Sequence, residues 1–338
     1  MTKIEFWKNR NVLITGINGF IGGNLAKTLC NNGANVVGII RNQNKNSFLY
    51  FEGIADRVNL VNGNVIDKEL IKRVISEERI SVVFHLAAQV EVGIAKIYPH
   101  LTWETNIKGT YSLLEAIREN GPMIKAVVIA SSDKAYGSYE PDKLPYREEY
   151  PLIPIYPYDV SKACADMIAK SYTSELFSLP IIITRFSNIY GPGQLNFSAL
   201  IPDAIRAALG FGKFIPRSNG LNVRDYIFID DVIHLYMLFA EKLATNKNLK
   251  GEIFNAGTSK PKRVRDIVKQ IYDILKKKKE YRQIDALWSK HKTLGEIDCQ
   301  HMNYDKVSSY FGWNPSVDFD RGLKQTIAWY EEYFRRKV

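Results

Sequence analysis

Residues 11–31 read NVLITGINGFIGGNLAKTLCN, and this stretch decides the fold. The β-branched run at 11–15 predicts a buried strand, and apolar residues at helical spacing predict a helix over 21–31. Between them three glycines allow a tight turn, close approach of a ligand to the backbone, and close helix–strand packing. The glycines are spaced GxxGxxG: Gly16, Gly19 and Gly22. Because the helix then presents free N–H groups to a phosphate, we expect a dinucleotide site here.

Short β-branched runs continue to alternate with helical patterns through the first half of the chain. Strands separated by helices of this length pair in parallel through right-handed crossovers. The prediction is an α/β fold with a Rossmann-type doubly wound parallel sheet, which binds ligands at the carboxyl ends of its strands. The further strands are expected at 36–40, 58–61, 82–86, 126–130 and 181–185.

Proline and glycine become frequent after residue 190, and strands and helices no longer alternate cleanly. We therefore expect residues 1–190 to form mainly the dinucleotide-binding domain, with returns near 224–256. Residues 191–338 should form mainly a smaller C-terminal α/β lobe that binds the substrate. Within the returns, 226–229 and 254–256 are expected to rejoin the main sheet.

The composition excludes several classes of protein. The chain has 338 residues, 46% of them hydrophobic, without the run of about 18 apolar residues that a membrane span needs. The polar start of the chain does not fit a signal peptide. The net charge of +10 suits phosphorylated small molecules, and no nucleic-acid-binding motif accompanies the basic run at 276–279. Three distant cysteines without metal-ligand spacing indicate a cytoplasmic enzyme with free thiols: Cys30, Cys164 and Cys299.

Further positions at the strand ends are predicted to contact the cofactor. Arg41 follows the second strand, where a carboxylate would bond the ribose of NAD and an arginine would accept the 2′-phosphate of NADP. The residue type leaves both cofactors open. Asn64 and Val65 follow the third strand, where relatives of this fold meet the adenine. The small residues after the fourth strand let a cofactor lie close to the backbone. The remaining predicted contacts are Asn18, Phe20, Ile21, Leu86, Ala87, Ala88 and Gln89.

The strongest catalytic signal is Tyr158-x3-Lys162, because residues four apart share one face of a helix. The charge of Lys162 is expected to lower the pKa of the phenol from its usual value of about 10. Such a tyrosine can accept a proton from a sugar hydroxyl while hydride leaves for nicotinamide. Ser132 follows the fifth strand, where its hydroxyl can bond the reacting oxygen.

Two further groups stand beside Ser132 in the sequence. Hydride exchange at one carbon needs only the serine, tyrosine and lysine. Elimination of water also needs a base for a carbon-bound proton and an acid for the leaving hydroxyl, and Asp133 and Lys134 could supply both. The alternative is a surface ion pair on a loop.

At these residues the chain resembles the extended short-chain dehydrogenase/reductase family, the nucleotide-sugar epimerases and dehydratases. The resemblance runs from about Asn11 to Tyr330 and includes RFSNIYGPGQ at 185–194 and VRDYIFIDDV at 223–232. It implies that Ser132, Tyr158 and Lys162 form a catalytic triad. Asn106, in TNIKGT, falls among the cofactor contacts, together with Tyr158 and Lys162. The substrate contacts implied by the resemblance are Gln89, Ser132, Asn188, Gln194 and Arg224.

Within that family, Ser-Asp-Lys resembles the CDP-glucose 4,6-dehydratases, and Arg41-Asn42 resembles the arginine of GDP-mannose dehydratases. The likeness implies that Asp133 protonates the C6 hydroxyl and that Lys134 helps remove the C5 proton. The expected enzyme is a nucleotide-diphosphate-hexose 4,6-dehydratase with bound NAD, NADP staying open, and with CDP-glucose or a GDP-linked hexose favoured. Relatives are commonly dimers, so a homodimer is expected. The alternatives are a 4-epimerase or 4-dehydrogenase on the same scaffold, and a non-catalytic nucleotide-binding protein.

Overall fold

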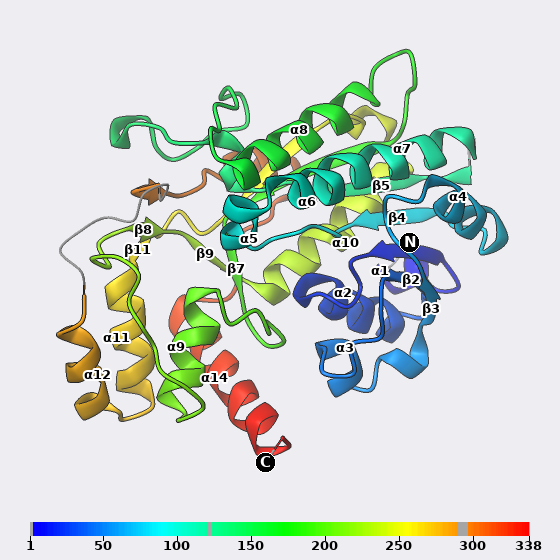
Figure 1. Cartoon of the computed structure of the whole chain (residues 1–338). Coiled ribbons are helices and arrows are strands. Elements are labelled where there is room, and N and C mark those ends of the chain that lie inside the picture. The colour runs from blue at the N-terminus through cyan, green and yellow to red at the C-terminus, as the bar shows by residue number, and fades with distance from the viewer. Residues whose placement is uncertain (1–2, 121–122, 289–296, 338) are drawn as a thin grey trace. The chain divides into compact units, whose positions relative to one another are not determined.

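The structure is a computed structural model that describes residues 3–120, 123–288 and 297–337 (Figure 1). The chain forms two compact units. The first unit consists of Met1–Tyr136, Pro151–Arg185 and Ile233–Phe254. The second consists of Gly137–Tyr150, Phe186–Val232 and Asn255–Val338. The chain therefore crosses between the units several times.

A seven-stranded sheet, in the order β10-β6-β5-β4-β1-β2-β3, forms the centre of the first unit. The pairs from β3 to β6 are all parallel. The order reverses between β1 and β4, and a doubly wound sheet binds its ligand beside such a reversal. Every expected strand of the first half is confirmed, with ends shifted by a residue or so. The strands are β1 Asn11–Thr15, β2 Asn35–Ile40, β3 Asn59–Asn62, β4 Val82–His85, β5 Ala126–Ala130, β6 Ile181–Phe186 and β10 Ile253–Ala256.

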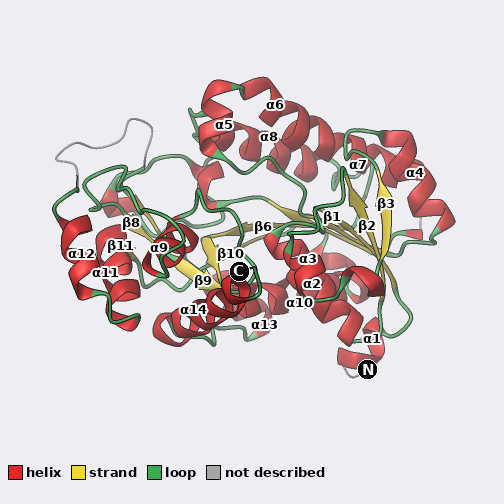
Figure 2. Cartoon of the chain, turned by 60° about the horizontal axis from the view of Figure 1, so that its bottom comes forward, coloured by secondary structure: helices red, strands yellow, loops and turns green. Residues whose placement is uncertain are grey.

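Helices cover both faces of this sheet (Figure 2). One face carries α4 Lys68–Glu77, α7 Gly109–Glu119 and α8 Pro157–Ser171, and the other carries α2 Phe20–Asn31 and α10 Ile229–Thr245. The start of α4 shows the local logic, since the Asp67 carboxylate accepts a hydrogen bond from the Leu70 N–H. Shorter helical segments of this unit are α1 Lys3–Trp7, α3 Phe48–Phe51, η1 Ala55–Arg57, α5 Val92–Ile97, α6 Pro99–Trp103, η2 Glu104–Lys108, η4 Asp133–Tyr136 and η6 Lys247–Leu249.

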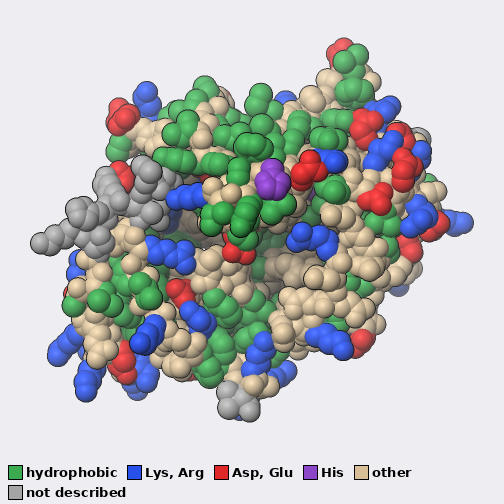
Figure 3. Space-filling view, in the orientation of Figure 1, with side chains coloured by type: hydrophobic (Ala, Val, Ile, Leu, Met, Phe, Trp, Pro, Cys, Tyr) green, Lys and Arg blue, Asp and Glu red, His purple; other side chains and the backbone are tan. Residues whose placement is uncertain are grey.

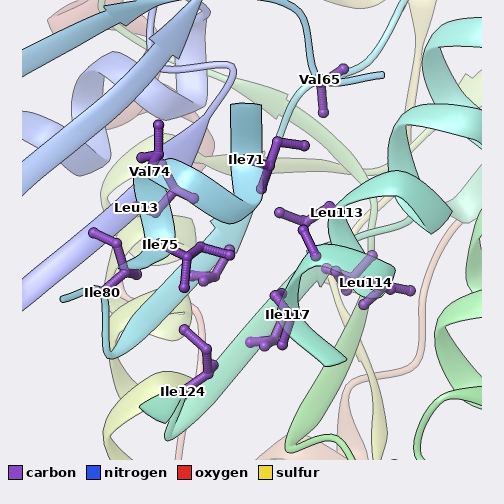
Figure 4. Close-up of a cluster of buried hydrophobic side chains, with 14 of the residues drawn as sticks. Leu13, Val65, Ile71, Val74, Ile75, Ile80, Leu113, Leu114, Ile117 and Ile124 are labelled. Atoms are coloured by element: carbon purple, nitrogen blue, oxygen red, sulfur yellow. The ribbon is translucent and has the colours of Figure 1, made fainter. Parts of the chain in front are cut away.

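The core between the sheet and the α4–α7 layer explains why the strands are continuous apolar runs. Leu13 of β1 packs with Ile71 and Val74 of α4 and with Leu113 and Ile117 of α7, and all five are buried (Figure 4). A parallel sheet covered on both faces has no polar side, so its strands do not alternate. The ends of these strands are consequently where polar side chains can gather.

The second unit contains two small sheets. β7 Asn188–Tyr190 pairs with β9 Tyr226–Phe228, and a separate sheet has the order β11-β8-β12. The expectation that 226–229 joins the main sheet is therefore wrong, because a three-residue strand takes its partner from tertiary context. The expectation that 254–256 joins the main sheet is confirmed by β10. The other elements are η5 Pro141–Lys143, β8 Val223–Arg224, β11 Lys262–Arg263, β12 Cys299–Gln300, α9 Leu200–Ala208, α11 Val264–Ile274, α12 Lys278–Asp285, α13 Asp305–Phe311 and α14 Phe319–Arg335.

Within the three described ranges, no helix combines the length and the apolarity that crossing a bilayer requires.

Candidate active site

The glycine loop leads from β1 into α2 and leaves no room for side chains. Gly16 has a φ of +77°, and a Cβ there would lie 2.7 Å from the Ala87 nitrogen. A Cβ on Gly22 would lie 2.3 Å from the Gly16 carbonyl oxygen. The loop therefore holds the ends of β1 and β4 and the first turn of α2 against one another. This is the close-packed turn that a pyrophosphate-binding loop requires.

The polar atoms of the loop also suit a dinucleotide. Helix α2 begins after Gly19, with no side chain capping its first N–H groups and no acidic residue in its first turn. A phosphate is the natural partner of such a helix start. The Asn18 Oδ1 atom is buried without a hydrogen-bond partner among the described residues, while its Nδ2 donates to Asn42 O at 3.2 Å. The uncapped helix start fits a dinucleotide phosphate, and the Asn18 Oδ1 atom could accept a hydrogen bond from a ribose hydroxyl of the same ligand.

The other predicted cofactor residues lie at the same ends of their strands. Arg41 is exposed directly after β2. Asn64 is exposed after β3, and its side chain accepts from the Ile66 N–H at 3.3 Å, while Val65 is buried in the core. The half-buried segment 86–89 follows β4. Asn106 is 2% exposed in the π-helical segment η2 and accepts from the Gln89 N–H at 2.7 Å.

Ser132 and Tyr158 meet at the end of β5. Tyr158 lies in the first turn of α8, where Pro157 opens the helix, and it is 8% exposed. Burial raises the pKa of the Tyr158 phenol well above its usual value, the charges of Asp133 and Asp159 raise it further, and a hydrogen bond with Ser132 lowers it. The expected lowering of this pKa by Lys162 is therefore wrong for this structure, because desolvation dominates.

Lys162 lies one helical turn beyond Tyr158 and is 7% exposed. Its Nζ donates to the Ala130 carbonyl at the end of β5, at 2.7 Å. Burial lowers the pKa of the Lys162 amine to about 8, against an opposing effect of Asp166. Asp166 is in turn held by two hydrogen bonds from Arg185, at 2.8 and 2.9 Å. The ammonium is thus fixed between the sheet and α8 and is largely charged at neutral pH.

Asp133 and Lys134 begin the short helix η4 after Ser132. Ser132 Oγ donates to Asp133 Oδ1 at 3.0 Å and accepts from the Lys134 N–H at 3.2 Å. Asp133 is only 4% exposed and Lys134 is half-buried, an environment that a solvated surface pair would not have. The carboxyl and the serine hydroxyl thus lie together beside the phenol of Tyr158.

A second carboxyl in this cluster was not predicted from the sequence. Asp159 is 5% exposed, and burial raises the pKa of its carboxyl to about 6, with Lys134 lowering it and Asp133 raising it. The sequence signal was an acid directly after the tyrosine of the Tyr-x3-Lys pattern. The carboxyl of Asp159 in the first turn of α8 therefore interacts with the carboxyl of Asp133 and the amine of Lys134 on η4.

The predicted substrate contacts fall in both units. Gln89 and Ser132 belong to the first unit, whereas Asn188, Gln194 and Arg224 belong to the second. Within the second unit, Asn188 Nδ2 donates to Asp225 O at 3.2 Å, beside Arg224. The Arg224 guanidinium donates to Val223 O at 2.9 Å and Asp298 O at 3.3 Å. Gln194 Oε1 accepts from the Asn196 N–H at 3.2 Å.

The first unit therefore combines a loop suited to a dinucleotide, at the end of β1, with a set of proton-transfer groups at the end of β5. Comparisons with known proteins agree with this combination. A family model described as GDP-mannose 4,6 dehydratase matches residues 13–326. A dTDP-glucose 4,6-dehydratase of Shigella flexneri is 32% identical, and the match covers 94% of this chain and 92% of that protein.

Two solved structures show the same fold along almost the whole chain. The dTDP-glucose 4,6-dehydratase of Bacillus anthracis, in complex with NAD, has a TM-score of 0.81 at 32% identity and covers 96% of this chain and 97% of its own. The UDP-glucose 4-epimerase of Thermotoga maritima, with UDP-glucose, has a TM-score of 0.82 at 28% identity and covers 97% and 99%. The chain belongs to the GDP-mannose 4,6 dehydratase family, a nucleotide-sugar family of extended short-chain dehydrogenase/reductases.

Proposed function

We propose that this chain is a nucleotide-diphosphate-hexose 4,6-dehydratase that makes a 4-keto-6-deoxy sugar. The observation that carries the proposal is the buried Asp133 carboxyl, hydrogen-bonded to Ser132 beside Tyr158 and followed by Lys134. A 4-epimerase or 4-dehydrogenase has no step that uses this additional acid and amine. The likeness to an epimerase is one of fold and sequence, and these two groups are what favours the dehydratase over the epimerase reaction in our proposal.

The residues divide the reaction between them. Tyr158 accepts the C4 hydroxyl proton as a phenolate, Lys162 supplies a positive charge one helical turn away, and Ser132 bonds both the phenol and the reacting oxygen. Bound NAD would supply the hydride acceptor for C4 and the hydride donor for C6. The C4 ketone acidifies C5, so Lys134 can take the C5 proton while Asp133 protonates the departing C6 hydroxyl as water. The C5 proton is restored when hydride reaches C6.

The resident cofactor proposed is NAD. The glycine cradle and the start of α2 fit the pyrophosphate, and the Bacillus anthracis relative was solved with NAD. The exposed Arg41 keeps NADP as the alternative, and the mass of the nucleotide released on denaturation distinguishes the two. The named relatives act on dTDP- and UDP-linked sugars. We therefore propose no single nucleobase for the substrate, and CDP- and GDP-linked sugars are to be tested beside them.

Asp159 supports the elimination chemistry by keeping a proton in the cluster. Two carboxyls near one amine cannot both ionise freely, so their titrations are coupled. The pKa of Asp159, raised to about 6 by burial and by Asp133, places one proton of the pair within reach of neutral pH. We propose that this shared proton is the source of the acid for the C6 hydroxyl.

We propose a homodimer formed through an apolar helical face of the first unit. Large apolar side chains, each at least 40% exposed, lie on the neighbouring helices α5 to α8, where hydrophobic side chains gather in Figure 3. A two-fold interface uses the same patch on both copies, so one such face is sufficient. The members of this helical face are Ile97, Tyr98, Leu101, Trp103, Tyr111 and Met167.

The first prediction tests the reaction class. Incubated with dTDP-, UDP-, CDP- and GDP-hexoses, the enzyme should give with one of them a product lighter by one water in mass spectrometry. Tyr158→Phe should abolish turnover and leave cofactor binding near normal, because only the phenolic oxygen is lost. Tyr172→Phe, at the other end of α8, is the matched control. A product of unchanged mass would identify an epimerase.

Elimination and oxidation should be separable by mutation. Asp133→Asn and Lys134→Met each remove one proton-transfer group, which typically contributes about 10² to 10⁴ in rate. We expect a loss of that order in 4-keto-6-deoxy product, with reduced cofactor building up after sugar is added. Asp142→Asn and Lys143→Met, an exposed pair on η5, are the controls. Wild-type rates in the first two variants would leave the dehydratase proposal without its main support.

The stability of the protein should depend on Asp159. Because the folded-state pKa of about 6 lies above the usual value of 3.8, folding is favoured when this group is protonated, and that contribution is lost as pH rises through 6. Asp159→Asn should raise the free energy of unfolding by about 3 kcal/mol at pH 8, with the difference vanishing near pH 4. Urea unfolding measures this, with the exposed Asp56→Asn as control. A pH-independent difference would contradict the assignment.

The dimer proposal makes a prediction about a single side chain. Met167→Lys places a charge on the apolar helical face, where Met167 is 63% exposed, and should convert dimer to monomer in light scattering. Leu176→Lys changes a side chain that is 85% exposed in the turn after α8 and should leave the mass unchanged. A wild-type monomer at micromolar concentration would refute the proposal.

A further inference from the structure

His85 is a polar residue at the end of the otherwise apolar strand β4, and neither the reaction nor the cofactor cradle described above uses it. Its side chain is 3% exposed, and both ring nitrogens have hydrogen-bond partners. Nδ1 lies 2.8 Å from Thr15 Oγ1, at the end of β1 beside the glycine loop. Nε2 lies 3.1 Å from Thr110 Oγ1, on α7. The ring therefore links β1 to α7, which the hydrogen bonds of the sheet do not connect.

The direction of each hydrogen bond follows from counting protons. Thr110 Oγ1 donates its single proton to Asn106 O at 2.6 Å, so it must accept from His85 Nε2–H. His85 Nδ1 then carries no proton and accepts from the Thr15 hydroxyl. Thr15 Oγ1 completes its bonding by accepting from the Ala87 N–H at 3.3 Å. One neutral tautomer, with the proton on Nε2, satisfies every group in the chain.

Burial supports the same protonation state. Desolvation and, to a smaller extent, the charge of Lys162 together lower the pKa of His85 to about 3. The ring is therefore neutral across the whole range in which such an enzyme works. A neutral ring can donate on one side and accept on the other, whereas an imidazolium donates on both.

The hydrogen-bond chain continues from Asn106 to the catalytic tyrosine. Asn106 Nδ2 donates to Ser161 Oγ at 2.9 Å, and Ser161 Oγ donates to the Tyr158 carbonyl at 2.6 Å. Asn106 and Ser161 are 2% and 0% exposed, so water does not compete for these bonds. Asn106 lies in the π-helical segment η2, an irregularity that often marks functional positions. The chain of bonds thus runs from the glycine loop to the first turn of α8.

We propose that His85, as the neutral Nε2–H tautomer, is a positioning residue that fixes Tyr158 relative to the cofactor cradle through Thr110, Asn106 and Ser161. Hydride transfer requires the proton acceptor and the cofactor to hold one geometry, and a displacement of about 1 Å can cost about 100-fold in rate. The activity part of this inference rests on the proposed function, while the tautomer part does not.

The first test compares variants that break the chain at chosen points. Thr110→Val removes the link between His85 and Asn106, and should lower kcat by about 10- to 100-fold, with KM for the nucleotide sugar changed less than about threefold. Thr184→Val is the matched control, because Thr184 is equally buried and its hydrogen-bond partners, Ile129 O and Tyr236, do not belong to the chain of hydrogen bonds from His85 to Tyr158. Both variants should lose similar stability to urea, and only Thr110→Val should lose kcat.

Two substitutions of His85 separate its two sides. Gln places an amide near the position of Nε2 and can still donate to Thr110, whereas Asn places its amide near Nδ1 and reaches only Thr15. His85→Gln should therefore retain more kcat than His85→Asn. Equal kcat in both, or a wild-type kcat in Thr110→Val, would overturn the positioning role even where a nucleotide sugar is turned over.

The second test does not depend on any substrate. The nitrogen chemical shifts of the His85 ring, assigned among the five histidines by comparison with His85→Gln, report the tautomer directly. We expect an unprotonated Nδ1 and a protonated Nε2 from pH 6 to 8. A proton on Nδ1, or an imidazolium, would overturn the inference and leave the proposed reaction untouched.

Discussion

The close approach of the ends of β1 and β4 constrains the rest of the site. A Cβ on Gly16 would lie 2.7 Å from the Ala87 nitrogen, so the turn after β1 accepts only glycine. Because the strand order reverses between these two strands, their connections leave on opposite faces and the helix start of α2 stays accessible to a phosphate. The same strand ends carry Thr15 and His85, whose hydrogen bonds begin the chain that reaches Tyr158.

Desolvation dominates the protonation of the candidate catalytic cluster. Burial is the largest cause of the raised pKa of Tyr158 and Asp159 and of the lowered pKa of Lys162. Each shift favours the uncharged form, and the pKa values of Asp159 and Lys162 are thereby brought closer to each other. The cluster therefore suits a reaction that moves several protons and returns its redox group to the starting state. In the proposed reaction the side chains of this cluster carry out each proton transfer at C4, C5 and C6.

The sequence predicts what local patterns determine. The glycine spacing and the short strand-like runs identify the loop, the strands of the main sheet and the Tyr158–Lys162 pair, because each depends on neighbours in the sequence. The prediction that β9 joins the main sheet is wrong, since the few hydrogen bonds of a three-residue strand do not determine which sheet it joins. The sign of the Tyr158 pKa shift and the roles of Asp159 and His85 depend on burial and on residues distant in sequence. No spacing in the chain shows that Thr110, Asn106 and Ser161 meet.

In the reaction that we propose, Tyr158, Asp133 and Lys134 act in one closed sequence in which hydride leaves C4 and returns to C6 of the same sugar. A nucleotide sugar deuterated at C4 tests this most directly. We expect a 4-keto-6-deoxy product that has lost one water and carries the deuterium at C6, seen by mass spectrometry and proton NMR. Deuterium that remains at C4, or is released to a free cofactor in solution, would contradict it.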